Sequence, residues 1–342
     1  MTKKNLFFSP EWEHQSGVLL IWPDRNTDWC SDLWEVLPVY EQIAKEILLR
    51  EKLLLICRNR KELPLFLQKK NNQLCIIEME FNDTWARDSG PLTVFENGYP
   101  VLLNFRFNGW GMRYAACYDN QISSGLYNRN VFLKEVKLKN YSDFVLEGGS
   151  VENNGAGCLL TTDSCLLSKN RNEPKNKKEI ETLLKKVLYL KKIIWLHNGY
   201  LAGDDTDGHI DMMARFCDKD TIAYVKCYRE DDEHFLSLEK MEKELFNAVD
   251  QDGNKFNLVP VPLPDPVMDI DGSRLPASYL NFLILNDAVL VPVYNVLQDK
   301  TALDIMVSLF PGRQIIPIYS VPLIRQHGAI HCISMQFPKG VL

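Results

Sequence analysis

The chain has 342 residues, of which 46% are hydrophobic and 25% are charged, and its formal net charge is −6. This is the composition of an ordinary globular protein, and it excludes a disordered chain, a collagen-like repeat and a coiled coil. A mildly acidic chain matches nucleic acids and anionic membranes poorly, because both select basic surfaces. We therefore expect neither nucleic acid nor a membrane as a partner, whereas a cationic small molecule is compatible with the charge.

The nine cysteines are an odd number and include no C-x-x-C pair. This pattern argues against a disulfide framework, a zinc ribbon and a thioredoxin-type site. The apolar run 6–8 is too short for the hydrophobic region of a signal peptide. We expect a cytoplasmic protein.

In chain order, short apolar runs with β-branched residues predict strands. These runs are 17–22, 52–57, 73–79, 98–105, 192–196, 221–227, 279–285, 288–294 and 314–319. Helices are expected near 33–51 and 60–70, and stripes of apolar residues at helical spacing mark three more within 180–188, 235–249 and 303–310. More than one strand separates successive helices, which favours modules of two strands and a helix within one α/β domain, residues 1–342.

Four segments carry polar residues that folding alone does not require. The segment 84–91 brings Trp85 and Asp88 together directly after a strand, and the segment 145–150 places Glu147 ahead of two glycines. Taken alone, the first is explained at least as well as a turn stabilised by an Arg–Asp pair, and the second more commonly as a solvated turn.

The third segment, 203–211, reads GDDTDGHID and holds four carboxylates and one histidine. If it is extended, Asp207, His209 and Asp211 share one face, because side chains alternate along a strand. A metal ion or an organic cation would relieve the repulsion among these acids. A solvated acidic loop is the alternative, but the embedded histidine and the apolar run that follows argue against it.

The fourth segment, 328–336, places Cys332 between apolar residues near the C-terminus. Alone it would be a core residue, but together with His209 and the carboxylates it is a candidate nucleophile. His331 is adjacent in sequence, and neighbours in an extended segment point to opposite faces. We therefore expect His331 to pack elsewhere and His209 to be the partner of Cys332.

These segments, in their order and spacing, resemble the agmatine deiminases of the guanidine-modifying (pentein) superfamily, close to the bacterial peptidylarginine deiminases. The matching segments are WPDRNTDW (22–29), WARDSGP (85–91), FNGWG (107–111), EGGS (147–150), GDDTDGHID (203–211), YLNF (279–282) and GAIHCISMQFP (328–338). The resemblance covers nearly the whole chain. It implies an α/β fold that is a five-bladed propeller, with the active site where the modules meet.

The resemblance also implies a role for each matching residue. A guanidinium is a planar cation whose donors pair bidentately with carboxylates. The implied catalytic residues are Cys332 as nucleophile, His209 as general acid and base, Glu147 as the carboxylate that orients it, and Asp88 and Asp211 as the substrate clamp. Trp85, Asp205 and Asn281 are the further implied substrate-binding residues.

The activity that the resemblance implies is hydrolytic deimination of agmatine to N-carbamoylputrescine and ammonia, in putrescine biosynthesis. It would proceed through a covalent S-alkylthiouronium on Cys332, with no metal or organic cofactor. A homodimer is a separate expectation, because dimers are the commonest homo-oligomers. The chain departs from the family pattern where His327 replaces a glycine and Ser334-Met335 replace Thr-Gln. We expect His327 and Met335 to change the rim of the pocket and with it substrate preference or loop mobility.

Other functions remain open at this point. A peptidylarginine or free-arginine deiminase would need cationic groups for a carboxylate or peptide backbone, and Arg106 and Arg113 are the candidates. A manganese-dependent ureohydrolase could use the D-x-H-x-D pattern 207–211 to ligate metal and release urea, but it would leave Cys332 without a role. A papain-like hydrolase would not need the convergent acids, and a non-enzymatic binding protein would not need the nucleophile.

Overall fold

The computed structural model describes residues 6–342, and within this range the strands form five separate sheets. The sheets are β17-β2-β3-β4 (Ser334–Pro338, Gln15–Ile21, Lys52–Cys57, Leu74–Glu78), β1-β5-β6-β7 (Leu6–Phe8, Leu92–Glu96, Tyr99–Arg106, Lys137–Val145), β10-β9-β8 (Lys192–Leu196, Cys158–Thr162, Val151–Asn153), β11-β12-β13 (Ala214–Phe216, Thr221–Lys226, Asn257–Pro262) and β14-β15-β16 (Leu283–Ile284, Ala288–Val293, Gln314–Tyr319). Five sheets are the number that the resemblance implied.

Each sheet repeats one pattern of pairing. A short inner strand runs antiparallel to a middle strand, and the middle strand runs parallel to a third strand that follows a helix. The middle strands are apolar and buried along almost their whole length, because helices or neighbouring sheets cover both of their faces. This is why continuous apolar runs identified these strands in the sequence.

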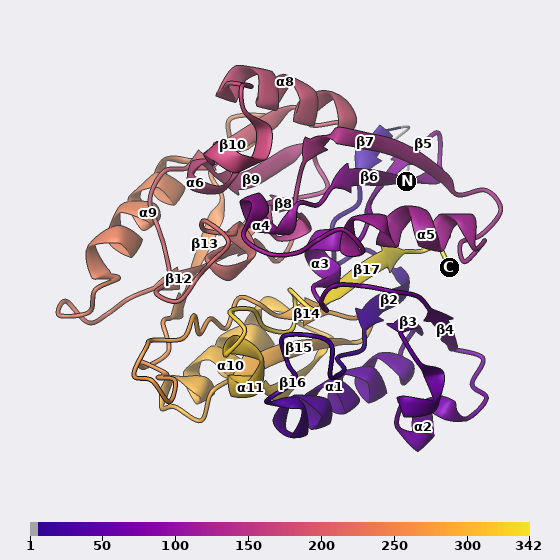
Figure 1. Ribbon diagram of the computed structural model, residues 1–342. Coiled ribbons are helices and arrows are strands. Elements are labelled where there is room, and N and C mark those ends of the chain that lie inside the picture. Colours follow the sequence, from indigo (N-terminus) through magenta and orange to yellow (C-terminus); the bar gives the residue numbers. More distant parts are fainter. Residues whose placement is uncertain (1–5) are drawn as a thin grey trace.

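The helices lie mainly at the outside of the molecule, around the inner strands (Figure 1). Their bounds are α1 (Leu33–Leu48), α2 (Leu65–Gln68), α3 (Ala86–Ser89), α4 (Gly109–Met112), α5 (Ile122–Asn128), α6 (Asp163–Leu166), α7 (Lys169–Asn172), α8 (Lys177–Val187), α9 (Phe235–Asn247), α10 (Gln298–Leu309) and α11 (Val321–Ile324). The helix expected at 60–70 is wrong in its extent: a 3₁₀ turn, Arg60–Glu62, and the short α2 flank Pro64, which removes a backbone donor.

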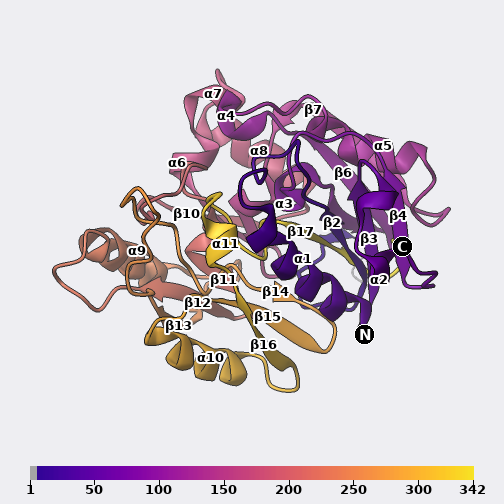
Figure 2. The same cartoon turned by 60° about the horizontal axis from the view of Figure 1, so that its bottom comes forward.

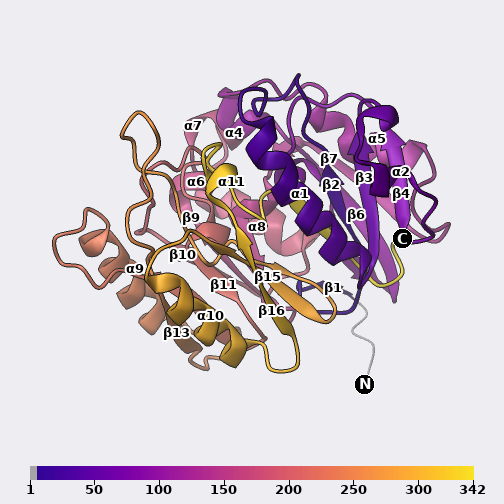
Figure 3. The same ribbon diagram turned by 90° about the horizontal axis from the view of Figure 1, so that it is seen from below.

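The ring of sheets is held closed in part by three crossover helices that each pack on two sheets. Helix α9 contacts β12 of its own sheet and β10 of the previous one, α10 contacts β16 and β13, and α1 contacts β3 and β16. Figure 3 shows α1 and α10 on the near side, each over its own sheet. The first sheet combines β17 with β2, so the two ends of the chain complete one blade. No helix within residues 6–342 is both long and apolar enough to cross a membrane.

Candidate active site

Each of the five inner strands is preceded by one of the predicted site residues. Asp88 lies ahead of β5, Glu147 ahead of β8, Asp211 ahead of β11, Asn281 ahead of β14 and Cys332 ahead of β17. Three of these junctions are single helical turns: α3 and the 3₁₀ turns Gly148–Ser150 and Ile210–Met212. Figure 2 shows α3 and β17 near the middle of the molecule. The repeated module therefore delivers one functional side chain from each blade to the centre.

A cavity of about 400 Å³ opens at this centre. Five predicted residues line it, namely Trp85, Asp88, Asp205, His209 and Cys332. The other three, Glu147, Asp211 and Asn281, are fully buried behind its wall, where each contacts a lining residue.

Cys332 lies at the wall with 7% of its surface exposed. Its Sγ accepts a hydrogen bond from Nδ2 of Asn281 at 3.1 Å and lies 3.8 Å from Oδ2 of Asp211. Burial raises the pKa of Cys332 well above the usual value for a thiol, and the charges of Asp211 and Asp88 raise it further. Without a bound cation, the group is therefore a neutral thiol at neutral pH.

Asp88 is held by two neutral donors. The indole Nε1 of Trp110 donates to its Oδ2 at 3.0 Å, and the backbone N–H of Gly149 donates to its Oδ1 at 2.9 Å. Burial, together with the nearby charges of Asp211 and Glu147, raises the pKa of Asp88 to about 6 although His209 lowers it. A side chain in place of Gly149 would put its Cβ 2.6 Å from Nδ1 of His209 and 3.1 Å from a carboxylate oxygen of both Asp88 and Asp211, so only glycine allows these groups to converge.

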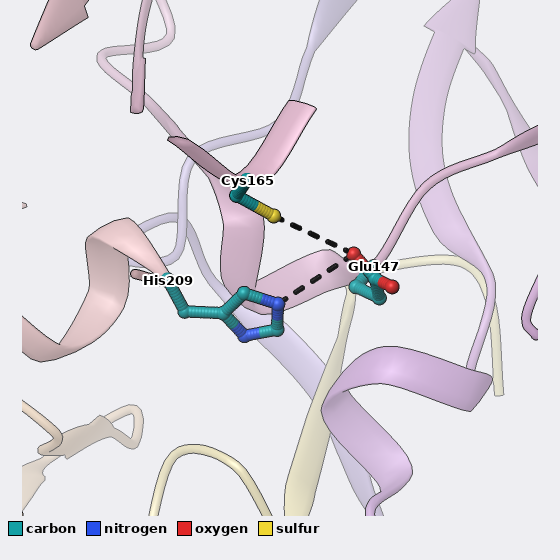
Figure 4. A group of neighbouring side chains, drawn as sticks. All are labelled: Glu147, Cys165 and His209. Atoms are coloured by element: carbon teal, nitrogen blue, oxygen red, sulfur yellow. Dashed lines mark hydrogen bonds and ion pairs between the residues drawn. The ribbon is translucent and has the colours of Figure 1, made fainter. Parts of the chain in front are cut away.

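His209 lies between Asp88 and Glu147, and only 1% of its side chain is exposed. Its Nε2 is 3.6 Å from Oε2 of Glu147, and Figure 4 shows this nitrogen and the Cys165 thiol directed at the same carboxylate. Burial opposes the positive charge of His209, but Asp88, Cys165 and Glu147 together hold the pKa of His209 well above its usual value. His209 is therefore protonated and can act as a proton donor.

Arg171 fixes Glu147 through its Nε, which donates to Oε1 at 3.0 Å and to Oε2 at 2.8 Å. Donor atoms of Glu147, Cys165 and His209 lie within 4.8 Å of one another, and these residue types are zinc ligands. Because the buried guanidinium of Arg171 already uses both carboxylate oxygens, a divalent cation fits this group poorly. The arrangement favours holding a proton on His209, and the absence of a metal stays a prediction.

The expectation that Asp207, His209 and Asp211 share one face is wrong. Asp207 and Gly208 both adopt positive φ angles, 68° and 87°, so the segment turns instead of running as a strand. The carboxylate of Asp207 pairs with Arg113 and Arg171. It therefore lies apart from Asp211, and the D-x-H-x-D pattern does not assemble into a metal site.

The family of this chain is shown by its match to a protein-family model. A model of the Porphyromonas-type peptidyl-arginine deiminases matches residues 7–338. The chain belongs to this family.

Relatives of this deiminase family carry more than one substrate in their names. A crystal structure of a Porphyromonas gingivalis protein, provisionally named an arginine deiminase, is 45% identical with a TM-score of 0.93 over 98% of this chain and 99% of that chain. A Cys-to-Ser variant of the C. jejuni agmatine deiminase with substrate bound is 37% identical with a TM-score of 0.91, covering 98% and 97%. A curated Vibrio parahaemolyticus protein, provisionally named an agmatine deiminase, is 33% identical over 97% of this chain and 96% of its own length. The chain is an agmatine deiminase-family hydrolase.

Proteins with little sequence similarity to this chain share its fold. Structures of dimethylarginine dimethylaminohydrolase are only 11% identical but have a TM-score of 0.50 over 95% of this chain and 100% of that chain. This likeness concerns the fold alone. The predicted pentein-type α/β fold is confirmed.

Two departures from the deiminase pattern have different outcomes. His327 lines the cavity with a φ of 69°, in the region that favours glycine, and its Nδ1 is 2.7 Å from the carbonyl oxygen of Gly203. Met335 is 1% exposed and does not line the cavity, and its sulfur lies 3.6 Å from Nη1 of Arg87. The expected place of Met335 at the rim is therefore wrong, because β17 carries its side chain into the core.

Trp110 and Arg171 are site residues that the sequence reasoning missed. Trp110 lies within the FNGWG segment of the family pattern, which was a usable signal. Arg171 lies in a polar stretch with no pattern that distinguishes it from a solvated loop. Only the fold brings α7 next to Glu147.

Proposed function

We propose that this chain hydrolyses agmatine to N-carbamoylputrescine and ammonia, with Cys332 as the nucleophile. The observation that supports this most directly is the position of Cys332 at the wall of an acidic cavity, beside the carboxylates Asp88 and Asp211. A guanidinium carbon held by these carboxylates would lie against the sulfur. Four further aspartates line the cavity: Asp28, Asp83, Asp204 and Asp205.

The distal part of the cavity supports a substrate with an ammonium tail. Among the described lining residues, Arg113 is the single lysine or arginine. Its guanidinium already donates to the Asp207 carboxylate and to the carbonyl oxygen of Asp205. A substrate carboxylate would therefore find no free cation there, whereas an ammonium group would find unpaired carboxylates.

The first half of the reaction follows from the protonation states. A bound guanidinium offsets the charges of Asp88 and Asp211, which favours loss of the Cys332 thiol proton to the solvent and leaves the thiolate. The thiolate attacks the guanidinium carbon, and His209 gives its proton to the departing nitrogen, which leaves as ammonia. The product of this half is an S-alkylthiouronium on Cys332.

In the second half, neutral His209 takes a proton from water, and the resulting hydroxide attacks the same carbon. The carbon–sulfur bond then breaks, which releases N-carbamoylputrescine and restores Cys332. Glu147 keeps His209 oriented through both halves, and Arg171 keeps Glu147 ionised, since burial alone would raise the pKa of Glu147 and the contacts with His209 and Arg171 lower it. Trp85, Asp205 and Asn281 would bind or position the substrate and the sulfur.

A second candidate is deimination of arginine, free or in peptides. The name of the matching family and the 45% identical Porphyromonas gingivalis protein favour it. Against it, Arg113 is engaged in an ion pair with Asp207, and Arg106 is exposed and does not line the cavity. A ureohydrolase is opposed by the separation of Asp207 from Asp211.

Product analysis with chelator-treated protein tests the proposal. Agmatine, free arginine and an arginyl peptide are supplied separately, and ammonia, urea and the organic product are measured. Ammonia with N-carbamoylputrescine, undiminished by chelator, is the expected result. Preferential release of ammonia from arginine or peptide would transfer the assignment to the second candidate, and urea with putrescine would refute both.

The product suggests the context of the reaction. N-Carbamoylputrescine needs only loss of its carbamoyl group to give putrescine, so we place the enzyme in putrescine biosynthesis. We also propose that residues 1–342 form one catalytic domain, because the site takes a side chain from each of the five sheets. The homodimer stays a prediction.

A further inference from the structure

His331 precedes the nucleophile but faces away from the cavity. It is 2% exposed, and it borders a second, smaller cavity of about 40 Å³ together with Glu11, Arg87 and Glu152. It does not line the large cavity. Any influence of His331 on the reaction must therefore pass through the residues that it contacts.

Both ring nitrogens of His331 contact carboxylates from distant parts of the chain. Nδ1 lies 2.7 Å from Oδ2 of Asp211, and Nε2 lies 2.9 Å from Oε2 of Glu11. Each contact needs one hydrogen, since two lone pairs at this distance repel. A neutral imidazole carries only one N–H, so Asp211, His331 and Glu11, the buried triad, hold two hydrogens in their two contacts.

The surroundings of the buried triad act on its second proton in opposite directions. Arg215 pairs with Glu11 and Glu152, and Arg87 lies nearby. Burial, with Arg215 and Arg87, lowers the pKa of His331, whereas Glu11 and Asp211 act in the opposite direction. The net effect lowers the pKa of His331, and the pKa of Glu11 is lowered as well. It is therefore the two short contacts, and not the surroundings, that place the second proton in the buried triad, where the three coupled groups share it.

The number of protons in the buried triad determines the charge that lies next to Sγ of Cys332. With two protons the buried triad carries one negative charge, and with one proton it would carry two. The Asp211 oxygen bound to His331 is the one that lies 3.8 Å from Sγ of Cys332. The other oxygen, Oδ1, is buried without a hydrogen-bond partner among the described residues. An additional negative charge here would disfavour the thiolate.

We propose that His331 is a positioning residue: it holds a second proton between Asp211 and Glu11, which keeps a single negative charge beneath Cys332 and leaves Oδ1 of Asp211 free for the guanidinium. The part concerning the guanidinium rests on the proposed function. The part concerning charge does not, because it depends only on Cys332 and the buried triad.

The test is the pH dependence of Cys332 alkylation in the full-length chain. Iodoacetamide modification is followed by mass spectrometry of the peptide that carries Cys332, because Cys30, Cys75 and Cys117 are exposed and also react. His331→Gln keeps a donor for Asp211 but cannot hold the extra proton. It should raise the apparent pKa of Cys332 by about one unit or more, which lowers the alkylation rate about tenfold at a fixed pH.

The double variant E11Q/H331Q separates charge from structure. It removes the second carboxylate, so the charge beneath the sulfur returns to one unit and the alkylation profile should move back toward that of the parent. A merely structural role for His331 predicts that the second substitution adds further damage. Failure of the double variant to recover would overturn the proposal.

His234→Gln is the matched control. His234 is also 1% exposed, with Nδ1 2.7 Å from Oδ1 of Asp232, but it lies outside the buried triad. It should lose stability comparably and leave the pH dependence of Cys332 alkylation unchanged. An equal shift in this control, or none in His331→Gln, would refute the proposal.

Glu11→Gln alone supports the test if His331→Gln does not fold. With two protons in the parent triad, the substitution removes one carboxylate and its proton, so the alkylation profile should stay within about threefold of the parent. If the parent triad held one proton, the same substitution would remove a charge and speed alkylation about tenfold. Agmatine turnover by the parent is assayed in parallel, since its absence would count against the proposed function and not against the role of His331.

Discussion

Asp88 and Asp211 are two buried aspartates that lie against the same glycine, yet their surroundings differ. Neutral donors, Trp110 and Gly149, hold Asp88, and its pKa is raised to about 6. Burial would also raise the pKa of Asp211, but the contact with His331 outweighs it and the pKa of Asp211 is lowered. The comparison teaches that the partner, and not burial, decides which carboxylate of the proposed clamp titrates near neutral pH.

The largest expected effect on turnover comes from removing the thiol of Cys332, the group next to both aspartates. Cys332→Ala should lower turnover of agmatine by at least about 10⁴-fold, while calorimetry should still detect agmatine binding because both carboxylates remain. Cys75→Ala, on β4 and remote from the cavity, is the control and should keep parental turnover. Turnover by Cys332→Ala at a substantial rate would refute the covalent route.

Substituting each aspartate separately tests the difference between them directly. Asp211→Asn should lower kcat/KM about 10³-fold and Asp88→Asn about 10²-fold at pH 8, because removal of one partner of a buried charge pair is costly. The deficit of Asp88→Asn should shrink about tenfold at pH 5, where Asp88 of the parent is itself mostly protonated. Equal deficits at both pH values would contradict the assignment of the titrating carboxylate.

The pH profile of the parent gives the next effect in size. Only ionised Asp88 binds a guanidinium, so kcat/KM should fall about tenfold per unit below pH 6. Ionisation of Asp88 has the opposite effect on stability: it lowers the free energy of unfolding. Because the folded-state pKa of Asp88 lies above the usual value of 3.8 for this side chain, its contribution to the free energy of unfolding is full below about pH 4 and is lost as pH rises through about 6.

The direction of this pH dependence can be determined by measuring the free energy of unfolding in denaturant between pH 4 and 7. The stability difference between the parent and Asp88→Asn should change over this interval, because the asparagine variant lacks the titration. A constant difference would show that Asp88 does not titrate in this range.

The smallest effect concerns the rim, away from both aspartates. His327→Ala keeps a side chain at a φ of 69° and loses the contact with Gly203, whereas His327→Gly removes the backbone strain. The glycine variant should therefore be more stable than the alanine variant by about 1 kcal/mol. Denaturant unfolding of the two variants measures this difference, and equal stabilities would exclude strain at this position.

The sequence was most informative about the apolar strands and about the segments that carry the predicted site residues. The runs 52–57 and 192–196 are β3 and β10 with the expected bounds, because buried parallel strands are continuously apolar. The strand expected at 279–285 is wrong in its extent, because only Leu283–Ile284 forms a strand. Its first half instead serves the site, because Nδ2 of Asn281 donates to Sγ of Cys332.

Short inner strands such as β8 and β11 gave no usable pattern, because three residues are too few to show an alternation. The sequence also could not predict which residues lie at the rim of the cavity or which ion pairs form. Whether His327 lines the cavity and Met335 does not, or whether Asp207 faces Arg113 or Asp211, depends on backbone angles at a few residues that composition does not fix.

The sequence by itself determined which residue types are available for chemistry, a cysteine, a histidine and several carboxylates, and which segments form the buried strands. Only the tertiary structure decided their charge states. Glu11, Asp211 and His331 are far apart in the chain, and their contacts exist because β17 closes the ring beside β2. The physical reason is that a pKa depends on burial and on charges within a few ångströms, and these neighbours come from all parts of the chain.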